Sequence, residues 1–228
     1  ISYEDMLKEV TKGKTDKEIG SEFGFSRLTI GLLRRKYNIK SKFSDKKSHI
    51  NELLLSEEHR QIILGTIFGD GHFNTKGNLK ICHSAKQYAY SHWLQQKLLP
   101  LSFNLSYTST TNSFSFGTKS LDYVKNLRQK FYPNNIKIVP EDELWKLTPL
   151  SLAVWFMDDG GLMGSNNFLS TEGFSHEDRE IIRNYLKQKW GLTTTIRKHF
   201  KKKQNKYYFS IFFNAENSFN LSQIIKFY

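Results

Sequence analysis

The spacing of apolar residues over the first 40 positions predicts three short helices. Thr15 is a favourable N-cap for a helix that runs through Phe23, because its hydroxyl can accept a hydrogen bond from the first turn. Gly24 is expected to end this helix, and Ser26 to cap the next one, which runs to about Tyr37. We therefore expect a small helical module at residues 1–40.

The two capped helices of this module resemble the helix-turn-helix family over about 20 residues. The small Gly20 lets the helices approach, and Ile30 and Leu33 are placed to pack the second helix on the first. The exposed face of the second helix is predicted to carry Arg27, Thr29, Arg34, Arg35 and Lys36, which would contact DNA. The alternative is a small helical cap with a solvated basic face. Residues 41–51 are polar, charged and without periodicity, which predicts a linker.

The remaining residues, 52–228, contain an internal repeat. Four pairs of segments match in the same order, at separations that grow slowly: ILGTIFGDG (63–71) with LAVWFMDDG (152–160), WLQQKL (93–98) with YLKQKW (185–190), FSF (114–116) with FSI (209–211), and FY (131–132) with FY (227–228). Each match alone is weak, but four in register indicate two repeats, at residues 52–140 and 141–228.

Each repeat is predicted to be an α-β-β-α-β-β-α series, with a hairpin after each of its first two helices. Two copies give an α+β fold with two pseudo-symmetric four-stranded sheets, each covered by helices on one face. The open faces would form a saddle over a DNA duplex. Candidate DNA contacts on these faces are Asn74, Lys76, Asn78 and Lys80 in the first repeat, and Arg197, Lys198, His199, Lys201 and Lys203 in the second. A solvated charged face is the alternative for such a run.

Composition favours a nucleic-acid partner for this fold. The chain has 34 Lys and Arg residues against 22 Asp and Glu residues, a formal net charge of +12, which a polyanion would offset. No segment approaches the length of an apolar membrane span, so a membrane partner is not expected. The single cysteine, Cys82, excludes a disulfide framework and a cysteine-based zinc site. We expect an intracellular protein that binds double-stranded DNA.

Asp70 and Asp159 end the two matching helices of the repeats. Gly65 and Gly69 are small residues at helical spacing, so the two helices can pack closely and bring both carboxylates together. Adjacent carboxylates without an arginine partner repel each other unless a divalent cation lies between them, and oxygen ligands suit Mg²⁺. An isolated Asp-Gly pair is more often a turn, but two pairs at equivalent positions favour a shared metal site.

The segments ILGTIFGDG and LAVWFMDDG resemble the two motifs of the LAGLIDADG homing endonucleases, in the monomeric form with two fused repeats. The second motif is the more specific, because the first lacks alanine at its second position. The resemblance implies double-strand breaks at a long DNA site, with two or three Mg²⁺ ions between Asp70 and Asp159. It also implies the backbone carbonyls of Gly69 and Asp158 as further metal ligands.

The resemblance further implies polar and basic side chains around the scissile phosphates. His83 and Glu172 occupy equivalent positions at the ends of the second strands, where an exposed strand terminus is the alternative. Lys137 matches the basic residue after the closing helix of the first repeat, where it would stabilise charge on the phosphate; the alternative is a linker lysine. Repeat symmetry predicts a matching segment beyond Tyr228, and hence a more competent first active site in this chain.

The sequence therefore predicts a site-specific, Mg²⁺-dependent DNA endonuclease that acts as a monomer without an obligate protein partner. Two other functions remain open. An intron RNA maturase could share the fold and the charge. A non-catalytic DNA-binding regulator could combine the same modules, although the presence of both Asp70 and Asp159 argues against it, because a regulator needs no metal.

Overall fold

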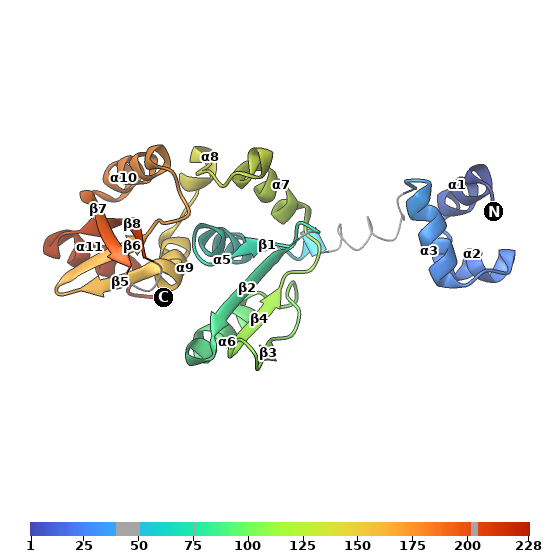
Figure 1. The fold of residues 1–228 in the computed structure, drawn as a ribbon, viewed down its shortest axis with the longest axis horizontal. Helices are drawn as coiled ribbons and strands as arrows, with labels where there is room; N and C mark the ends of the chain where they lie inside the picture. The colour runs from blue at the N-terminus through green and yellow to red at the C-terminus, as the bar shows by residue number, and fades with distance from the viewer. Residues whose placement is uncertain (40–50, 75, 202–204) are drawn as a thin grey trace. The chain divides into compact units, whose positions relative to one another are not determined.

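The computed structural model describes residues 1–39, 51–74, 76–201 and 205–228 (Figure 1). The chain divides into two compact units: an N-terminal unit of residues 1–54 with 120–122, and a core unit of residues 55–119 with 123–228. The predicted linker at 41–51 lies outside the described residues, apart from Asn51. No helix in the described part of the chain is long and apolar enough to cross a membrane.

The N-terminal unit contains three helices, α1 (Tyr3–Thr11), α2 (Asp16–Phe23) and α3 (Arg27–Lys36). The predicted caps are confirmed: the Thr15 side chain accepts from the Glu18 N–H, and the Ser26 side chain accepts from the Thr29 N–H. Gly24 ends α2 in the left-handed conformation, at φ 72°. The three helices share a core of Met6, Val10, Ile19, Ile30 and Ile39.

Arg34 does not lie on the exposed face of α3, which corrects the sequence-based expectation. Its guanidinium donates to both carboxylate oxygens of Asp16, at 2.8 and 2.9 Å, and to the Ile39 carbonyl at 3.2 Å. The reason is helical geometry, because Arg34 lies one turn beyond the buried Ile30. The residues that α3 does expose are Arg27, Leu28, Leu32, Arg35 and Lys36, with Thr29 half-buried.

The core unit contains one series of elements twice. Its first half has α5 (Glu57–Phe68), β1 (His72–Phe73), β2 (Leu79–Ser84), a 3₁₀ turn η1 (Ala85–Gln87), α6 (Tyr88–Lys97), β3 (Ser106–Thr108), β4 (Ser113–Gly117) and α7 (Asp122–Phe131). The connection holds a 3₁₀ turn η2 (Pro133–Asn135) and α8 (Glu141–Leu144). The second half has α9 (Pro149–Asp159), β5 (Gly160–Met163), β6 (Asn166–Ser170), α10 (His176–Trp190), β7 (Thr194–Lys201), β8 (Lys206–Phe213) and α11 (Ala215–Ile225).

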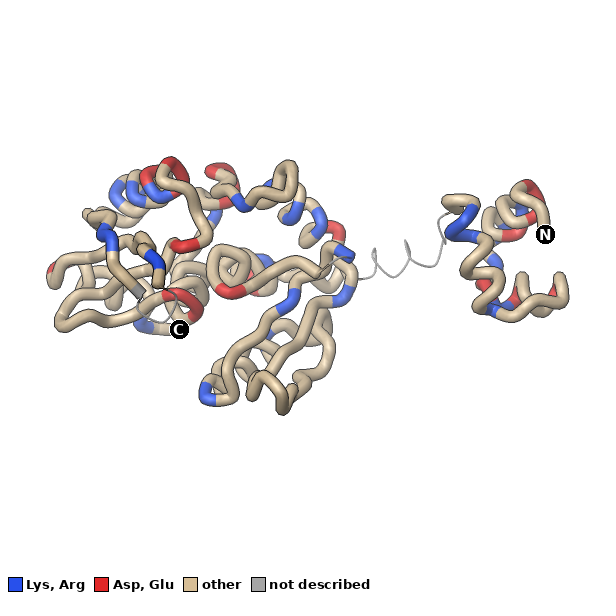
Figure 2. Tube along the Cα trace, in the orientation of Figure 1, with Lys and Arg blue, Asp and Glu red and all other residues tan. Residues whose placement is uncertain are grey.

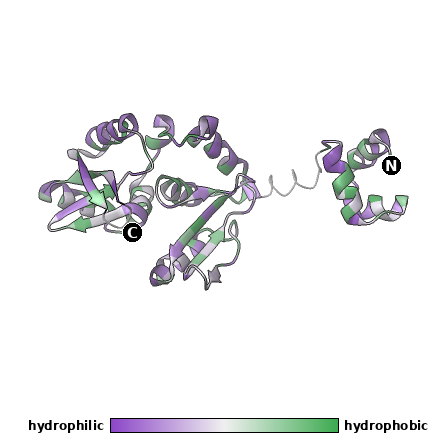
Figure 3. Cartoon of the chain, in the orientation of Figure 1, coloured by the Kyte–Doolittle hydropathy of each residue, from purple (hydrophilic) through white to green (hydrophobic). Residues whose placement is uncertain are grey.

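The two halves form two four-stranded antiparallel sheets, which confirms the predicted α+β class. Their strand orders correspond, β1-β2-β4-β3 in the first half and β5-β6-β8-β7 in the second. Along β2, Leu79, Ile81 and His83 are buried, whereas the alternate residues are exposed. The buried face packs on α6. In the second half α10, mostly hydrophilic in Figure 3, buries a stripe that includes Ile182 and Leu186 and packs against β7.

Helices α5 and α9 pack directly against each other at the centre of the core unit (Figure 1). A Cβ atom added to Gly65 would lie 2.4 Å from the Ser151 carbonyl oxygen and 2.9 Å from Val154 Cβ. A glycine at this position is therefore what allows the two backbones to approach so closely. This contact fixes the C-terminal ends of the two helices relative to each other, and those ends carry Asp70 and Asp159.

Candidate active site

Asp70 and Asp159 line one cavity of about 350 Å³, in agreement with the prediction that the two carboxylates come together. Asp159 is the last residue of α9, and Asp70 follows Gly69, the C-cap of α5. Lys137 and Glu172 line the same cavity. The Asp70 side chain is 44% exposed, so the cavity is open to solvent and a binding partner can reach this carboxylate.

Negative charge dominates this cavity. Burial, reinforced by the charges of Asp70 and Asp158, raises the pKa of Asp159 to about 7. Burial and the Asp158 charge also raise the pKa of the Asp70 carboxyl. Lys137 opposes both shifts, but one ammonium does not balance the cluster of acids. The arrangement therefore favours a bound cation or a positively charged partner group.

Lys137 belongs to the cavity and is not merely part of a connecting segment. The chain leaves α7 through η2, and the Ile138 N–H returns to the Phe131 carbonyl at 2.9 Å, which fixes the segment. The Lys137 Nζ atom lies 4.6 Å from the centroid of the Phe174 ring, a cation–π distance. Burial lowers the pKa of Lys137, while Asp159 and Asp70 act in the opposite direction.

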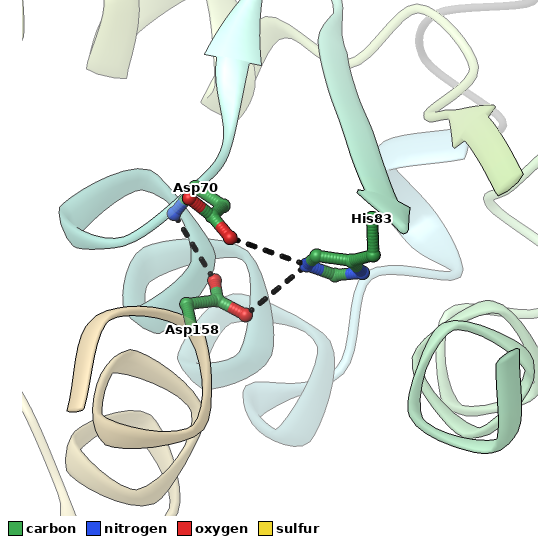
Figure 4. A group of neighbouring side chains, drawn as sticks. All are labelled: Asp70, His83 and Asp158. Carbon is green, nitrogen blue, oxygen red and sulfur yellow. Dashed lines mark hydrogen bonds and ion pairs between the residues drawn. The ribbon is translucent and has the colours of Figure 1, made fainter. Parts of the chain in front are cut away.

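His83 is buried, so the exposed strand terminus considered as its alternative is wrong. Its Nδ1 atom lies 3.1 Å from the Ser91 hydroxyl on α6. Its Nε2 atom faces two carboxylates, at 3.4 Å from Asp158 Oδ1 and 3.8 Å from Asp70 Oδ2 (Figure 4). Within the described residues, this Nε2 atom has no hydrogen-bond partner.

Asp158 directs its side chain into the first half of the core unit, which the sequence did not reveal. The carboxylate is fully buried; its Oδ1 accepts from the Tyr90 hydroxyl at 2.7 Å and its Oδ2 accepts from the Asp70 N–H at 3.3 Å. Burial and the Asp158 charge raise the pKa of Tyr90. Tyr90 is thus a site residue that the sequence analysis missed. A signal was available: Asp158 aligns with Gly69, so the extra carboxylate needs a donor that the repeat pattern does not supply.

The structure also shows which atoms could hold a metal ion. Ligand atoms of Asp70, His83 and Asp158 lie within 4.8 Å of one another. Asp70 is common to this group and to the cavity that contains Asp159. The described residues therefore offer two groups of possible ligands that share Asp70. One is the carboxylate pair of Asp70 and Asp159, and the other combines the carboxylates of Asp70 and Asp158 with the His83 imidazole.

The sequence profile of the LAGLIDADG DNA endonuclease family matches residues 60–220, which include α9 and most of α5. The chain belongs to the LAGLIDADG DNA endonuclease family. Its site is the meeting point of the two helices that carry the matching motifs.

The chain is also similar to proteins with several different names. An uncharacterised protein of Methanocaldococcus jannaschii is 28% identical over 84% of this chain and 80% of its own length. The cytochrome b mRNA maturase bI2 of Saccharomyces cerevisiae is 28% identical over 87% of this chain, and the RecA protein of Mycobacterium gastri is 32% identical over 64%. The chain spans only 51% of that maturase and 39% of that RecA protein.

A solved structure shows the same fold. The homing endonuclease I-WcaI, bound to its DNA recognition sequence, superimposes with a TM-score of 0.62 at 23% sequence identity. The match covers 76% of this chain and 83% of I-WcaI.

In this LAGLIDADG family member, Glu172 follows β6 and lines the cavity. The expected equivalence of Glu172 to His83 is wrong: Ile81 pairs with Phe116 and Leu169 with Ile211, which places Thr171 at the position of His83. His199 Nε2 on β7 lies 3.7 Å from Glu172 Oε1. His199 therefore lies near the edge of this cavity as well as being a candidate DNA contact. The two halves of the site differ, because a histidine faces aspartates in one half and a glutamate faces a histidine in the other.

Among the described residues, the other candidate DNA contacts of the core unit lie on strands and turns of the two sheets. Figure 2 marks the Lys and Arg positions of the chain in blue. Lys80 is exposed on β2, and the guanidinium of Arg197 and the ammonium of Lys198 lie over aromatic rings of β8. Asn74 also shapes its turn, because its side-chain oxygen accepts from the N–H groups of Lys76 and Asn78 at 2.9 and 3.1 Å. Lys203 and the side chain of Lys201 lie outside the described residues.

Proposed function

We propose that this chain is a site-specific DNA endonuclease that hydrolyses one phosphodiester in each strand of a long duplex site, with a divalent metal as cofactor. The observation that carries the proposal is the cavity in which Asp70, Asp159 and the half-buried Lys137 meet at the ends of two packed helices. Because both carboxylates come from one chain, the protein would act as a monomer.

The residues of the cavity fit a divalent metal. Its described lining contains three carboxylates, of Asp70, Asp159 and Glu172, and a single basic side chain, Lys137. Burial, followed by the charges of Asp70 and Asp158, raises the pKa of Asp159 to about 7, and a bound cation would stabilise the ionised carboxylate. Asp70 and Asp159 would hold the metal, with the carbonyls of Gly69 and Asp158 as further oxygen ligands, a donor set that suits Mg²⁺. When bound, the metal supplies a Lewis acid that activates water and neutralises phosphate charge.

The remaining side chains have defined parts in this proposal. The Lys137 ammonium, held over the Phe174 ring, would stabilise the negative charge that develops on the phosphate oxygens. Glu172 would orient water at the edge of the same cavity. His83 would act from the first half, where it lies near Asp70 and Asp158.

The open faces of the sheets would bind the DNA duplex, with basic side chains on the phosphates. Lys80 and Arg197 are exposed on such strands, one in each sheet. The N-terminal unit would extend the recognised site as a helix-turn-helix, since α3 exposes Arg27, Arg35 and Lys36. These three side chains, without Arg34, are the proposed DNA contacts of that helix.

Incubation with a randomised duplex library, with and without Mg²⁺, followed by sequencing of the cleaved ends, tests the proposal. We expect breaks at one family of related sites, only with Mg²⁺, and with short 3′ overhangs. The matched control is Asp70→Asn, which should retain binding and lose cleavage. Binding of duplex DNA by the wild-type protein without any cleavage would contradict the proposal and favour a regulator.

An intron RNA maturase is the second candidate, because similarity to the bI2 maturase extends over 87% of this chain. A maturase should bind a structured intron RNA more tightly than duplex DNA. Competition between the two nucleic acids at one salt concentration separates the functions, since the phosphate contribution is then matched.

A further inference from the structure

We propose that Tyr90 and Asp158 are positioning residues that hold Asp70 and His83 in place, and that they do so in one half of the site only. This inference rests on the proposed endonuclease function for its kinetic consequence, but the positioning itself is a property of the folded protein. Tyr90 lies on α6 of the first half, whereas Asp158 lies on α9 of the second.

Asp158 fills a space that its counterpart in the first motif leaves empty. A Cβ atom added to Gly69 would lie 2.5 Å from Asp158 Cβ and 2.6 Å from Asp158 Oδ2, closer than packed atoms approach. The two residues occupy equivalent positions in their motifs. Glycine in one motif and aspartate in the other are therefore complementary, since only one side chain fits between the helix ends.

The buried Asp158 carboxylate accepts hydrogen bonds from two groups of the first half. Its Oδ1 accepts from the Tyr90 hydroxyl at 2.7 Å, and the same hydroxyl lies 3.3 Å from the Val154 carbonyl. Its Oδ2 accepts from the backbone N–H of Asp70 at 3.3 Å. A fully buried carboxylate must be satisfied by such donors, so its orientation is strongly fixed. Fixing it also fixes the backbone of Asp70.

The same network holds His83. Consecutive residues of α6 contact it from two sides: the Ser91 hydroxyl lies 3.1 Å from Nδ1, and the Tyr90 ring lies 5.1 Å from the imidazole centroid to centroid. Asp158 Oδ1 then lies 3.4 Å from Nε2 (Figure 4). Removal of the Tyr90 hydroxyl would therefore release the carboxylate that lies against both His83 and Asp70.

The described residues of the second half form no equivalent network. The match between WLQQKL and YLKQKW places Ile182 at the position of Tyr90, and Ile182 is a buried apolar residue. Gly69, the counterpart of Asp158, has no side chain to extend toward Asp159. We therefore expect loss of the Tyr90 hydroxyl to disturb Asp70 and to spare Asp159, so that the two strands of the DNA are affected unequally.

A double-mutant cycle of Tyr90→Phe and Asp158→Asn tests the contact without metal or DNA. Urea unfolding in EDTA gives the folding equilibrium constant of each variant. If the two groups act together, the fold-decrease in the folding equilibrium constant of the double variant is smaller than the product of the fold-decreases of the two single variants. Effects that multiply without coupling would overturn the positioning. Because this measurement needs no cleavage, it is informative even if the proposed nuclease activity fails.

The kinetic test uses a plasmid that carries the site recovered from the duplex library. Tyr90→Phe should lower the rate of one strand's cleavage about tenfold and leave the Kd for DNA unchanged, so that nicked plasmid accumulates. The matched control is Tyr185→Phe, which removes another buried hydroxyl, one that accepts from Trp190 Nε1 at 2.9 Å on α10. The control should leave the ratio of the two strand rates unchanged.

Equal slowing of both strands by Tyr90→Phe, or the same nicked intermediate with Tyr185→Phe, would overturn the inference. Absence of cleavage by the wild-type protein would instead contradict the proposed function, and the double-mutant cycle would then decide the positioning alone.

Discussion

Replacement of Asp159 by asparagine should stabilise the metal-free protein at alkaline pH, although it should abolish cleavage. The raised pKa of Asp159 means that the folded protein binds this proton more tightly than the unfolded chain does. The resulting stability is complete below about pH 4, declines as the pH rises, and is lost above about pH 7. Asparagine stays neutral throughout, so the variant should escape this decline.

The size of the effect follows from the pKa values of Asp159. Its pKa rises from the usual 3.8 to about 7. Each pKa unit corresponds to about 1.4 kcal/mol, so a shift of roughly three units gives about 4 kcal/mol as an upper value. Relaxation around the ionised carboxylate would reduce it, and we expect a gain of about 2–4 kcal/mol in the free energy of unfolding at pH 8. At pH 4 the variant and the wild type should differ little.

Urea unfolding in EDTA at pH 4 and pH 8, followed by tryptophan fluorescence, measures this difference. All four tryptophans belong to the core unit, and Trp155 is fully buried on α9 itself. The matched control is Asp142→Asn, because Lys130 holds the pKa of the exposed Asp142 below its usual value, and no gain at pH 8 is expected. Mg²⁺ should stabilise the wild type at pH 8 and have less effect on Asp159→Asn. A gain of the same size at both pH values, or a loss at pH 8, would refute the reasoning.

Three further predictions test separate parts of the molecule. Lys137→Met should slow cleavage about 10²- to 10³-fold and preserve the Kd for DNA, as measured by single-turnover kinetics and gel shift; equal loss of binding would contradict the assigned role. Deletion of residues 1–48 should shorten the DNase I footprint at one end and leave Mg²⁺-dependent cleavage intact; an unchanged footprint would reduce the N-terminal unit to a structural cap. Gly65→Ala should lower the free energy of unfolding by about 1–3 kcal/mol, because its Cβ would meet the Ser151 carbonyl at 2.4 Å; an unaltered urea midpoint would show that α5 and α9 can separate without cost.

Much of the architecture could be predicted from the sequence because it depends on local signals. Thr15 and Ser26 cap their helices through side-chain bonds to residues three positions away, and such bonds need only local geometry. The internal repeat made it possible to predict which distant segments lie together, because equivalent elements occupy equivalent places in the two halves. Equivalent motifs in equivalent elements predicted that Asp70 and Asp159 share a cavity.

The parts that were missed depend on the direction of a side chain between elements. The position of Arg34 in the sequence fits an exposed basic face, and only its contact with Asp16 on the neighbouring helix shows otherwise. The resemblance to the family implied a role for the backbone carbonyl of Asp158. It implied nothing about the carboxylate of the same residue. Its contact with Tyr90 joins residues of different halves, and no periodicity within either half encodes such a contact.

The complementarity of Gly69 and Asp158 limits how the two halves could be rearranged. Two copies of the first half would place glycine opposite glycine, which leaves a gap at the helix crossing and removes the carboxylate that accepts from the Tyr90 hydroxyl. Two copies of the second half would force two aspartate side chains into the room for one, since even a single Cβ at position 69 would lie 2.5 Å from Asp158 Cβ. Neither half is therefore suited to a homodimer without compensating changes. A split or chimeric nuclease built from this chain should exchange its helix ends as a matched pair, and heterodimeric assembly of separated halves should be favoured over self-association.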